Sequence, residues 1–364
     1  MKIIDKYILK QLAAPFLFGV FAFVSIFIGT DILFDLADYV IEWGVPLLTV
    51  MQLFFLSMPE IIVLTFPMAT LLATLLVFGR LSGNSEIVAL KAGGVSFIRL
   101  VIPLLIAAFL ISGLNVLIAD TLVPRSNEFY SQLTWDIENQ ESFPTTQKHL
   151  RMTPIDSSTD RIDYIFYAYK FDGADMTMEE VSFQDYERGR LAQVIEAERA
   201  EWTNQQWKFL DGKIYDLQDG ELVPTMNFQE YAVKRLDRTP TQVRRSQQDE
   251  DEMTLSELWE WITLRESEGR DVTELKVDFH HRFSIPFASF IFALIGAPLG
   301  LQPNRSSTSI GLGLSIVIIF IYYSVMTIGS TLGQSGALAP WLGAWIQNFI
   351  FGLVGIGLII RAAR

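Results

Sequence analysis

Six long apolar stretches, three on each side of a polar middle section, define the pattern of the chain. They cover approximately residues 12–36, 47–78, 98–122, 283–301, 310–332 and 341–360. A helix needs about 20 apolar residues to cross the hydrocarbon core of a membrane, and each stretch reaches roughly that length. The pattern therefore predicts a membrane α-helical fold with six transmembrane helices, arranged as three helices, an insertion and three helices.

The insertion, residues 124–280, has the pattern of β-strands. Aromatic and β-branched residues occur there in short runs, which turn residues separate. The strand candidates are 164–171, 180–183, 207–210, 214–217 and 228–233. Asp211-Gly212 stands between two of them and is a signal for a two-residue hairpin turn. Short strands at such intervals favour an all-β sandwich or jellyroll-like domain.

A connecting helix is predicted near the end of the insertion, over about residues 254–268. Thr254 and Glu257 have the spacing of a capping box, in which each side chain bonds the backbone N–H of the other residue. Leu258 and Ile262 then fall on one apolar face. We expect this helix to pack against the membrane or the β domain. The predicted domains are therefore 1–123, 124–280 and 281–364.

A short polar segment separates the second and third apolar stretches. Asn84 or Ser85 can cap a helix start with a side-chain oxygen, and Glu86 in the first turn suits the helix dipole. Gly93 and the glycine after it supply a stop. We predict a helix of about two turns within residues 84–94. Held between two spans, it suits docking into a groove of another protein, although an ordinary interfacial turn has the same pattern.

Carboxylates interrupt the apolar stretches in two places. Asp31, Asp35 and Asp38 follow one another at helical spacing near the outer end of the first stretch, so they lie near one helix face. They either mark the water boundary or line a polar cavity, which Phe34 would also face. Glu60 lies well inside the second stretch, where a carboxylate faces a cavity or a partner, or is a hydrogen-bonded packing residue.

Composition supports the membrane assignment and limits the partners. Half of the 364 residues are apolar, and the mean hydropathy is +0.31. The net charge of −13 comes from the insertion, because residues 125–282 contain 19 basic and 33 acidic side chains, a balance of −14. A nucleic-acid partner is not expected, since phosphate backbones need a basic surface. The chain has no cysteine, which excludes disulfides and thiolate metal sites.

Basic residues indicate the orientation, because short cytoplasmic segments carry an excess of Lys and Arg. With the N-terminus inside, every basic residue of the termini and short connections is cytoplasmic; these are Lys2, Lys6, Lys10, Arg80, Lys91, Arg99, Arg305, Arg361 and Arg364. The outer turns at 38–46 and 333–340 contain no Lys or Arg. We therefore expect both termini and the helix at 84–94 in the cytoplasm, and the β domain on the outer side of the membrane.

The sequence lacks the motifs of nucleotide binding and hydrolysis. It contains no P-loop, no H-E-x-x-H and no G-x-S-x-G, so we expect a transmitter that receives energy from a separate ATPase rather than an enzyme. His280 and His281 are adjacent and point in different directions on a helix, so we assign no metal. Arg125 and Arg282 stand at outer ends of spans. They either belong to polar interfacial clusters or bind an anionic headgroup through their fork geometry.

Five motifs together resemble the lipopolysaccharide export permeases of the LptF/LptG (YjgP/YjgQ) family. They are I-D-K-Y-I at 4–8, P-E at 59–60, F-P-M-A at 66–69, S-E-I-V-A-L-K-A-G-G at 85–94 and G-A-L-A-P-W at 336–341. Each motif alone is weak. Combined with the arrangement of three spans, an outer β domain and three spans, they cover essentially the full length and are specific.

The resemblance implies a permease subunit of an ATP-driven transporter in the bacterial inner membrane. In this family, two permease subunits, as a hetero- or homodimer, enclose a central cavity on an LptB-like cytoplasmic ATPase dimer, which uses ATP and Mg. The helix between the second and third spans is the coupling helix, and its acidic residue matches Glu86. The ATPase-coupling candidates are Ser85, Glu86, Ile87, Ala89, Leu90, Lys91 and Gly93.

The resemblance also implies the path of the substrate. Lipopolysaccharide enters the cavity sideways from the outer leaflet of the inner membrane, past the first and fifth spans. The outer β-jellyroll then hands it to periplasmic jellyroll proteins that resemble LptC and LptA. An alternative of another class is an ATPase-coupled mechanical signalling subunit, which acts on a periplasmic partner without moving lipid.

One departure from the family concerns the lipid phosphates. Other members place Lys or Arg near the outer end of the first span, where this chain has aspartates. The phosphate contacts then come from Arg125, Arg282 or the partner subunit, or the lipid is a related anionic one. The candidate substrate-binding residues are Phe34, Asp31, Asp35, Glu60, Arg125 and Arg282.

Overall fold

The computed structural model divides the chain into two compact units. One comprises Met1–Glu138 with Thr273–Arg364, and the other comprises Asn139–Val272. The residues that the structure describes are 3–41, 43–139, 146–152, 155–156, 161–172, 175, 177–187, 190–203, 206–218, 221–233, 235–236, 249–267, 269–301 and 308–363. The boundaries lie further into the insertion than the apolar stretches alone predict, because the helices on both sides of it extend past those stretches.

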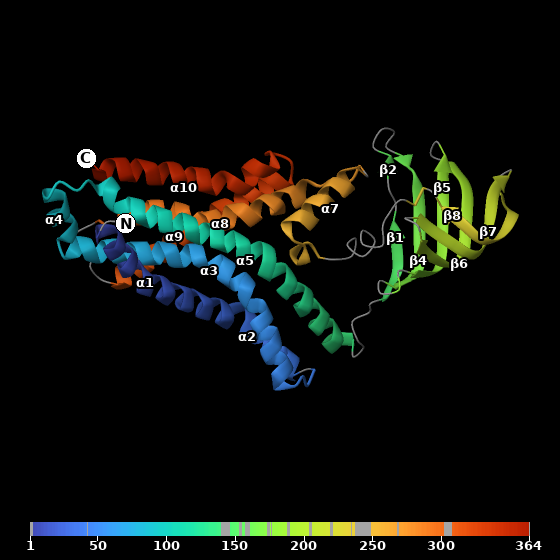
Figure 1. Ribbon diagram of the computed structural model, residues 1–364, viewed down its shortest axis with the longest axis horizontal. Coiled ribbons are helices and arrows are strands. Elements are labelled where there is room, and N and C mark those ends of the chain that lie inside the picture. The colour runs from blue at the N-terminus through green and yellow to red at the C-terminus, as the bar shows by residue number, and fades with distance from the viewer. Residues whose placement is uncertain are drawn as a thin grey trace. The chain divides into compact units, whose positions relative to one another are not determined.

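Six helices in the described part of the first unit are long and apolar enough to cross a membrane. They are α1 (Ile3–Phe27), α3 (Leu47–Gly83), α5 (Phe97–Asn139), α8 (Thr273–Leu299), α9 (Thr308–Gln334) and α10 (Pro340–Ala363) (Figure 1). Three shorter segments connect them: η1 (Ile28–Ile32), α2 (Leu33–Ile41) and α4 (Glu86–Ala92). The predicted helical fold, with three membrane helices on each side of an insertion, is confirmed.

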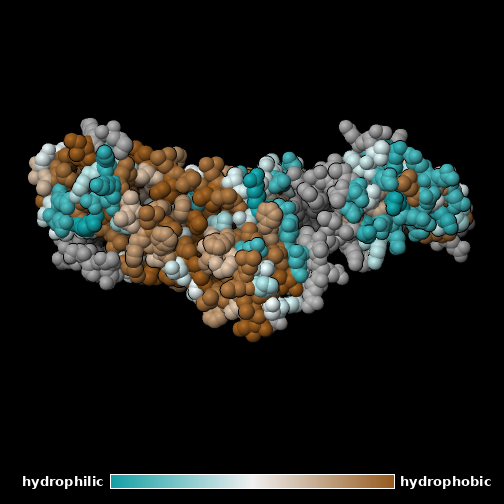
Figure 2. All heavy atoms as spheres, turned by 60° about the horizontal axis from the view of Figure 1, so that its bottom comes forward, coloured by the Kyte–Doolittle hydropathy of each residue, from teal (hydrophilic) through white to brown (hydrophobic). Residues whose placement is uncertain are grey.

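Helices α3 and α8 form the interior of this unit. Each membrane helix contains an apolar stretch of 18 residues. This stretch is 72% buried in α3 and 61% buried in α8, but only 17% buried in α1 and in α9. Gly296 of α8 and Gly300, just after its end, face α3, and a Cβ added at Gly300 would lie 2.7 Å from the Cβ of Phe78. Small residues at this spacing allow α8 to approach α3 closely. Figure 2 shows hydrophobic residues over much of the surface of the helices and hydrophilic residues over the strands.

Helix α5 continues far beyond its apolar stretch, through Pro124 to Asn139. A proline removes one backbone hydrogen bond, but neighbouring packing can maintain a helix across it. The extension buries Tyr130, Leu133 and Ile137, at helical spacing, against a cluster that includes Leu36 and Leu53. Contacts with α2 and α3, which are distant in sequence, therefore support the polar end of α5.

The second unit contains a six-stranded antiparallel sheet among its described residues. The strands are β1 (Thr146–Met152), β4 (Tyr164–Asp172), β5 (Thr177–Glu187), β6 (Arg190–Thr203), β7 (Gln206–Gln218) and β8 (Glu221–Val233), in this order across the sheet. A separate ladder pairs β2 (Ile155–Asp156) with β3 (Arg161–Ile162). Phe166, Phe183, Trp207 and Phe209 are at most 1% exposed in its core. The all-β insertion is confirmed, and its described strands form a meander.

All six strands are irregular along one row across the sheet, which we call the crease. The pairing of every neighbouring pair skips one residue on each strand; the skipped residues are His149, Tyr169, Glu180, Glu198, Asp211 and Gln229. The alternation of burial changes phase at this row. In β7, Trp207 and Phe209 are buried before Asp211, and Ile214 is the buried residue after it. The crease thus keeps apolar side chains on one face although their spacing shifts by one residue.

The crease explains why the hairpin prediction at Asp211-Gly212 was wrong. β7 passes through both residues without a turn, and Gly212 pairs with Ala197 on one side and Phe228 on the other. Asp211 has a φ of 51°, which is the local signature that resembles a turn. The Phe228 ring covers Gly212, because an added Cβ would lie 2.3 Å from its Cζ. The two strand candidates on either side are therefore one strand.

The connecting helix α7 (Leu255–Ser267) is formed as predicted, after a 3₁₀ turn, η2 (Glu250–Glu252). The backbone N–H of Thr254 donates to Oε2 of Glu257 at 3.0 Å, and the backbone N–H of Glu257 donates to Oγ1 of Thr254 at 3.4 Å. These reciprocal bonds confirm the capping box. Leu258 and Ile262 of the predicted apolar face are both buried.

Candidate functional site

Helix α4 lies at the end of the helical unit that also holds the N- and C-terminal residues. It connects α3 with α5, and the start of α1 and the end of α10 lie at the same end of the unit (Figure 1). The hydroxyl of Tyr7 in α1 donates to Oε2 of Glu86 at 2.7 Å. Nζ of Lys91 donates to the carbonyl oxygen of Ala362 in α10 at 3.1 Å. The segment is therefore bonded to the first and last helices as well as joined to α3 and α5.

The N-terminal end of α4 differs from the predicted cap. Ser85 precedes the helix with a φ of 60°, and its side chain makes no capping hydrogen bond. Nδ2 of Asn84 donates to Oε1 of Glu86 at 3.3 Å, so this side chain binds the carboxylate instead of the backbone. The prediction that Asn84 or Ser85 caps the helix was therefore wrong. Glu86 is half-buried, and both of its oxygens accept hydrogen bonds within the chain.

The other end and the inner face attach α4 to the helical unit. Gly94 has a φ of 84°, and the N–H of Val95 donates to the carbonyl of Leu90 at 3.0 Å, which is the left-handed glycine stop that the sequence predicts. Ile87 is 4% exposed and packs in a cluster with residues of α1, α3 and α5. Val88 is 64% exposed. Ile87 thus anchors the helix, and the side of Val88 is accessible to another protein.

The structure separates the predicted coupling residues into an accessible group and an internal one. Ser85, Ala89, Lys91 and Gly93 are exposed, and Glu86 and Leu90 are half-buried. Ile87 is buried within the subunit, so its place in this segment is that of an anchor that holds α4 to the other helices. Val88, which the sequence prediction omitted, is the most exposed large apolar side chain of the segment.

Three polar contacts, which we call the α1 clasp, fix the first turns of α1 to three neighbouring elements. Nη2 of Arg99 in α5 lies 2.6 Å from Oδ1 of Asp5. Tyr7 bonds Glu86 of α4, and Arg80 of α3 donates to Gln11. Sequence reasoning missed these pairs, because their members are 69 to 94 residues apart.

The acidic end of the first span is less regular than its spacing predicts. Ile28–Ile32 is π-helical, and the N–H of Leu33 donates to the carbonyl of Ile28. The wider turn rotates the following residues around the axis, so simple helical spacing does not relate Asp31 to Asp35. Asp35 is exposed, Phe34 is 66% exposed, and the side chain of Asp31 lies outside the described part. π turns occur frequently at functional sites, and the sequence pattern did not reveal this one.

The other predicted substrate residues lie on three different helices. Glu60 is exposed on α3, Arg125 is exposed on α5, and Arg282 is half-buried on α8. Nε2 of His281 lies 2.7 Å from Oγ of Ser330, so this histidine joins α8 to α9. His281 is therefore a polar contact between these two helices.

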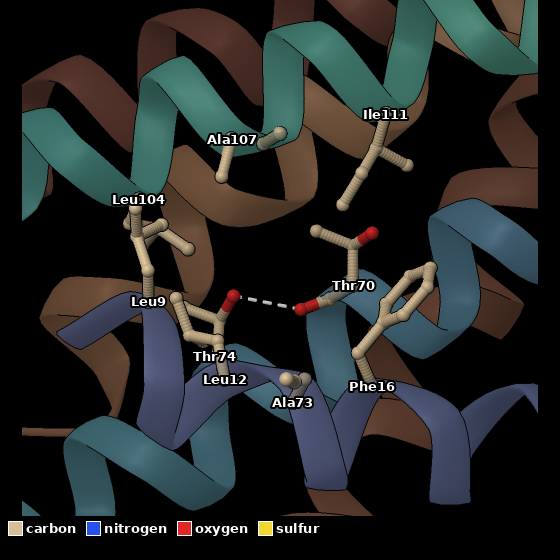
Figure 3. Close-up of a pocket in the computed structure, with 11 residues that line it drawn as sticks. Leu9, Leu12, Phe16, Thr70, Ala73, Thr74, Leu104, Ala107 and Ile111 are labelled. Carbon is tan, nitrogen blue, oxygen red and sulfur yellow. Dashed lines mark hydrogen bonds between the residues drawn. The ribbon is translucent and has the colours of Figure 1, made fainter. Parts of the chain in front are cut away.

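Two hollows lie among the described helices. A partly open cavity of about 140 Å³ is lined by α1, α3 and α5, where Leu12 and Phe16 face Leu104 and Ala107 (Figure 3). The hydroxyl of Thr74 at its wall donates to a backbone carbonyl of its own helix, so the wall is effectively apolar. A groove of about 490 Å³ lies between α3 and α5, lined by Gln52, Phe55, Leu56, Phe129, Gln132, Leu133 and Asp136.

These features define a membrane protein with several spans, in which a short accessible helix, α4, is hydrogen-bonded to the first and last membrane helices. The family model for "Lipopolysaccharide export system permease LptF/LptG" matches residues 6–361, and the chain belongs to this family. Members of the family are permease subunits of the lipopolysaccharide export system and not its catalytic subunits.

Relatives of both names are similar to the chain over most of its length. LptF of Escherichia coli strain K12 is 22% identical over 370 residues, which cover 96% of this chain and 92% of that protein. LptG of the same strain is 22% identical over 313 residues, 84% of each chain. An uncharacterized Rickettsia prowazekii protein, RP871, is 28% identical over 127 residues, 35% of each chain. Because the chain is 22% identical to both LptF and LptG, the comparison does not assign it to one of the two subunits.

Proposed function

We propose that this chain is a permease subunit that extracts lipopolysaccharide, or a related anionic lipid, from the outer leaflet of the inner membrane. A separate LptB-like ATPase dimer supplies the energy by hydrolysing ATP with Mg. Periplasmic proteins with LptC/LptA-like jellyrolls receive the lipid. The observation that carries the proposal is α4, a short helix with an anchored inner face, an accessible outer face and bonds to α1 and α10.

The charge distribution supports a cytoplasmic position for α4 and both termini. The described basic residues at this end of the helical unit are Lys6, Lys10, Arg80, Lys91, Arg99 and Arg361. At the opposite end, residues 335–339 between α9 and α10 carry no charge, and α2 contributes Asp35 and Asp38. The excess of basic residues on cytoplasmic segments then puts the β insertion in the periplasm.

A second permease subunit would complete the lipid site. The cavity of about 140 Å³ is the size of one that binds benzene, and the groove between α3 and α5 is about 490 Å³, the size of a site for one small molecule. Both are too small for a lipid with several acyl chains. α1 and α9 have the least buried apolar stretches, and residues of both pack around Met68. The two helices therefore both pack at Met68, and their exposed apolar faces are suited to border a cavity shared with a partner.

The lipid headgroup and the periplasmic bridge use other parts of the chain in this proposal. Arg125 and Arg282 offer fork-shaped donors for phosphate, while Asp35 would repel it, so the partner subunit supplies further contacts. Strands β1 and β8 are the edges of the sheet, and an edge can pair with a strand of another protein. Exposed apolar residues near the β7–β8 turn support docking there; they are Leu217, Leu222, Val223 and Met226.

A single introduced cysteine tests the orientation and the docking role, because the chain has no cysteine of its own. We expect Val88→Cys in the assembled transporter to cross-link to the cytoplasmic ATPase through a short thiol-reactive linker. Ala337→Cys, exposed between α9 and α10, is the matched control and should instead react with a membrane-impermeant maleimide from the periplasmic side. Labelling of Val88→Cys from the periplasm, or co-purification without the cross-link, would contradict the proposal.

A further inference from the structure

The Tyr7 hydroxyl gives the Glu86 carboxylate a partner outside its own segment. Oε2 of Glu86 accepts the Tyr7 bond at 2.7 Å, and Oε1 accepts a bond from Asn84 at 3.3 Å. Asn84 belongs to the turn that precedes α4, so its bond is local. The Tyr7 bond connects α4 to α1, through a residue 79 positions earlier in the chain.

Among the three contacts of the α1 clasp, the Tyr7 bond alone reaches α4. Asp5 and Gln11 hold the same turns of α1 to α5 and α3. Further along the chain, the hydroxyls of Ser25 in α1 and Thr30 in η1 bond backbone carbonyls of residues just before them. The described side-chain bonds from α1 to other elements are therefore concentrated at its first turns.

The remainder of α1 is placed so that it can follow a movement of these turns. Only 17% of its apolar stretch is buried, against 72% for α3. The apolar cavity beside the clasp is lined by Leu9, Leu12, Ala13 and Phe16 of α1 (Figure 3). Closely packed interiors resist displacement, whereas unfilled volume leaves room for a helix to shift. α1 is thus fixed by polar bonds in its first turns and has unfilled volume beside Leu12 and Phe16. Further along it packs closely on α3, where a Cβ added at Gly19 would lie 3.0 Å from the Cα of Ala69, so a movement of α1 reaches α3.

We propose that Tyr7 is a positioning residue for ATPase coupling, whose hydroxyl holds the Glu86 carboxylate against α1 so that displacement of α4 reaches the first membrane helix. This inference rests on the proposed function and specifies the route from α4 into the membrane. A hydrogen bond to a charged group is stronger than one between neutral groups, so the carboxylate makes this link firmer than a neutral side chain would.

The test uses the complete transporter in proteoliposomes, with ATP hydrolysis and lipid release measured separately. Tyr7→Phe keeps the ring and removes only the hydroxyl. We expect the lipid released per ATP to fall about tenfold, as for the loss of a hydrogen bond to a charged group, while ATP hydrolysis stays within about twofold of wild type. Thr263→Val, which removes a hydroxyl that bonds the Trp259 carbonyl within α7, should leave the ratio unchanged.

A double-mutant cycle separates positioning from a general structural effect. If Tyr7 acts through Glu86, adding Tyr7→Phe to Glu86→Ala should lower the ratio no further. Three results would overturn the inference. The first is a normal ratio of lipid to ATP for Tyr7→Phe. The others are a double variant whose loss is the product of the two single losses, and a loss that a smaller amount of assembled complex explains fully. If Glu86→Ala uncouples and Tyr7→Phe does not, the proposed function stands without this route. If Glu86→Ala leaves the ratio unchanged, the coupling role of α4 itself is wrong.

Discussion

Glu86→Ala should abolish ATP-driven lipid release, by at least about tenfold, while the chain remains folded and assembled. The substitution removes the acceptor of the Tyr7 and Asn84 hydrogen bonds, each of which involves a charged group. It leaves Ile87, the buried anchor of α4, in place. ATP hydrolysis should continue, because the chain has no nucleotide motif of its own and only the transmission is lost.

The measurement is lipopolysaccharide release from proteoliposomes that contain the complete transporter, with phosphate production followed in parallel. Glu266→Ala, at an exposed acidic position of α7, is the control for loss of one negative charge and should release lipid normally. Full release by Glu86→Ala would show that the acidic residue of α4 has no part in coupling.

Gly343→Ala should destabilise the helical unit more than its small change in size suggests. A Cβ at Gly343 of α10 would lie 2.7 Å from the carbonyl oxygen of Gly329 and 2.8 Å from the Cα of Gly333, both in α9. Backbone atoms cannot rotate away, so α9 and α10 must separate. We expect a loss at the upper end of the usual overpacking range of about 1–3 kcal/mol.

Thermal unfolding of the purified chain in mild detergent measures this effect. Gly357→Ala is the matched control in the same helix, because no atom outside its local backbone lies within 4 Å of the added Cβ. It should be neutral or stabilising by up to about 1 kcal/mol, since alanine favours helices over glycine. Equal melting temperatures for the two variants would contradict the packing that the structure describes at Gly343.

The sequence was most informative where a single segment determines its own structure. Long apolar runs predict the six helices, since a membrane leaves few alternatives for the backbone. Thr254 and Glu257 form their capping box within one turn. Gly94 ends α4 through a local left-handed conformation. These features depend on neighbours in the chain, and the sequence shows those neighbours.

Features that depend on distant contacts could not be predicted. α5 extends past Pro124 because Tyr130 and Leu133 pack against a cluster that contains Leu36. Asp211 and Gly212 are typical of a turn, but the crease runs through six strands and requires an irregular residue in each. A two-residue signal cannot distinguish a turn from an unpaired residue within a strand that neighbouring strands share.

The candidate site shows the same limit. The segment around α4 was recognisable from its polar residues and glycines, but both Ile87 and Val88 are apolar. Only the packing against α1, α3 and α5 shows that Ile87 is the anchor and Val88 the accessible side chain. Tyr7 belongs to a motif of the family resemblance, but that motif gave it no role, because its partner Glu86 is 79 residues away.

Photo-crosslinking from Phe34 to labelled lipopolysaccharide tests most directly whether this chain moves lipid. Phe34 is 66% exposed in α2, and a photoreactive residue at Leu353, 72% exposed on α10, is the control. In the assembled transporter, we expect a cross-link at position 34 before ATP is added and its decrease during turnover, with no change at position 353. Absence of the cross-link at position 34 while ATP is hydrolysed would contradict lipid extraction by this subunit.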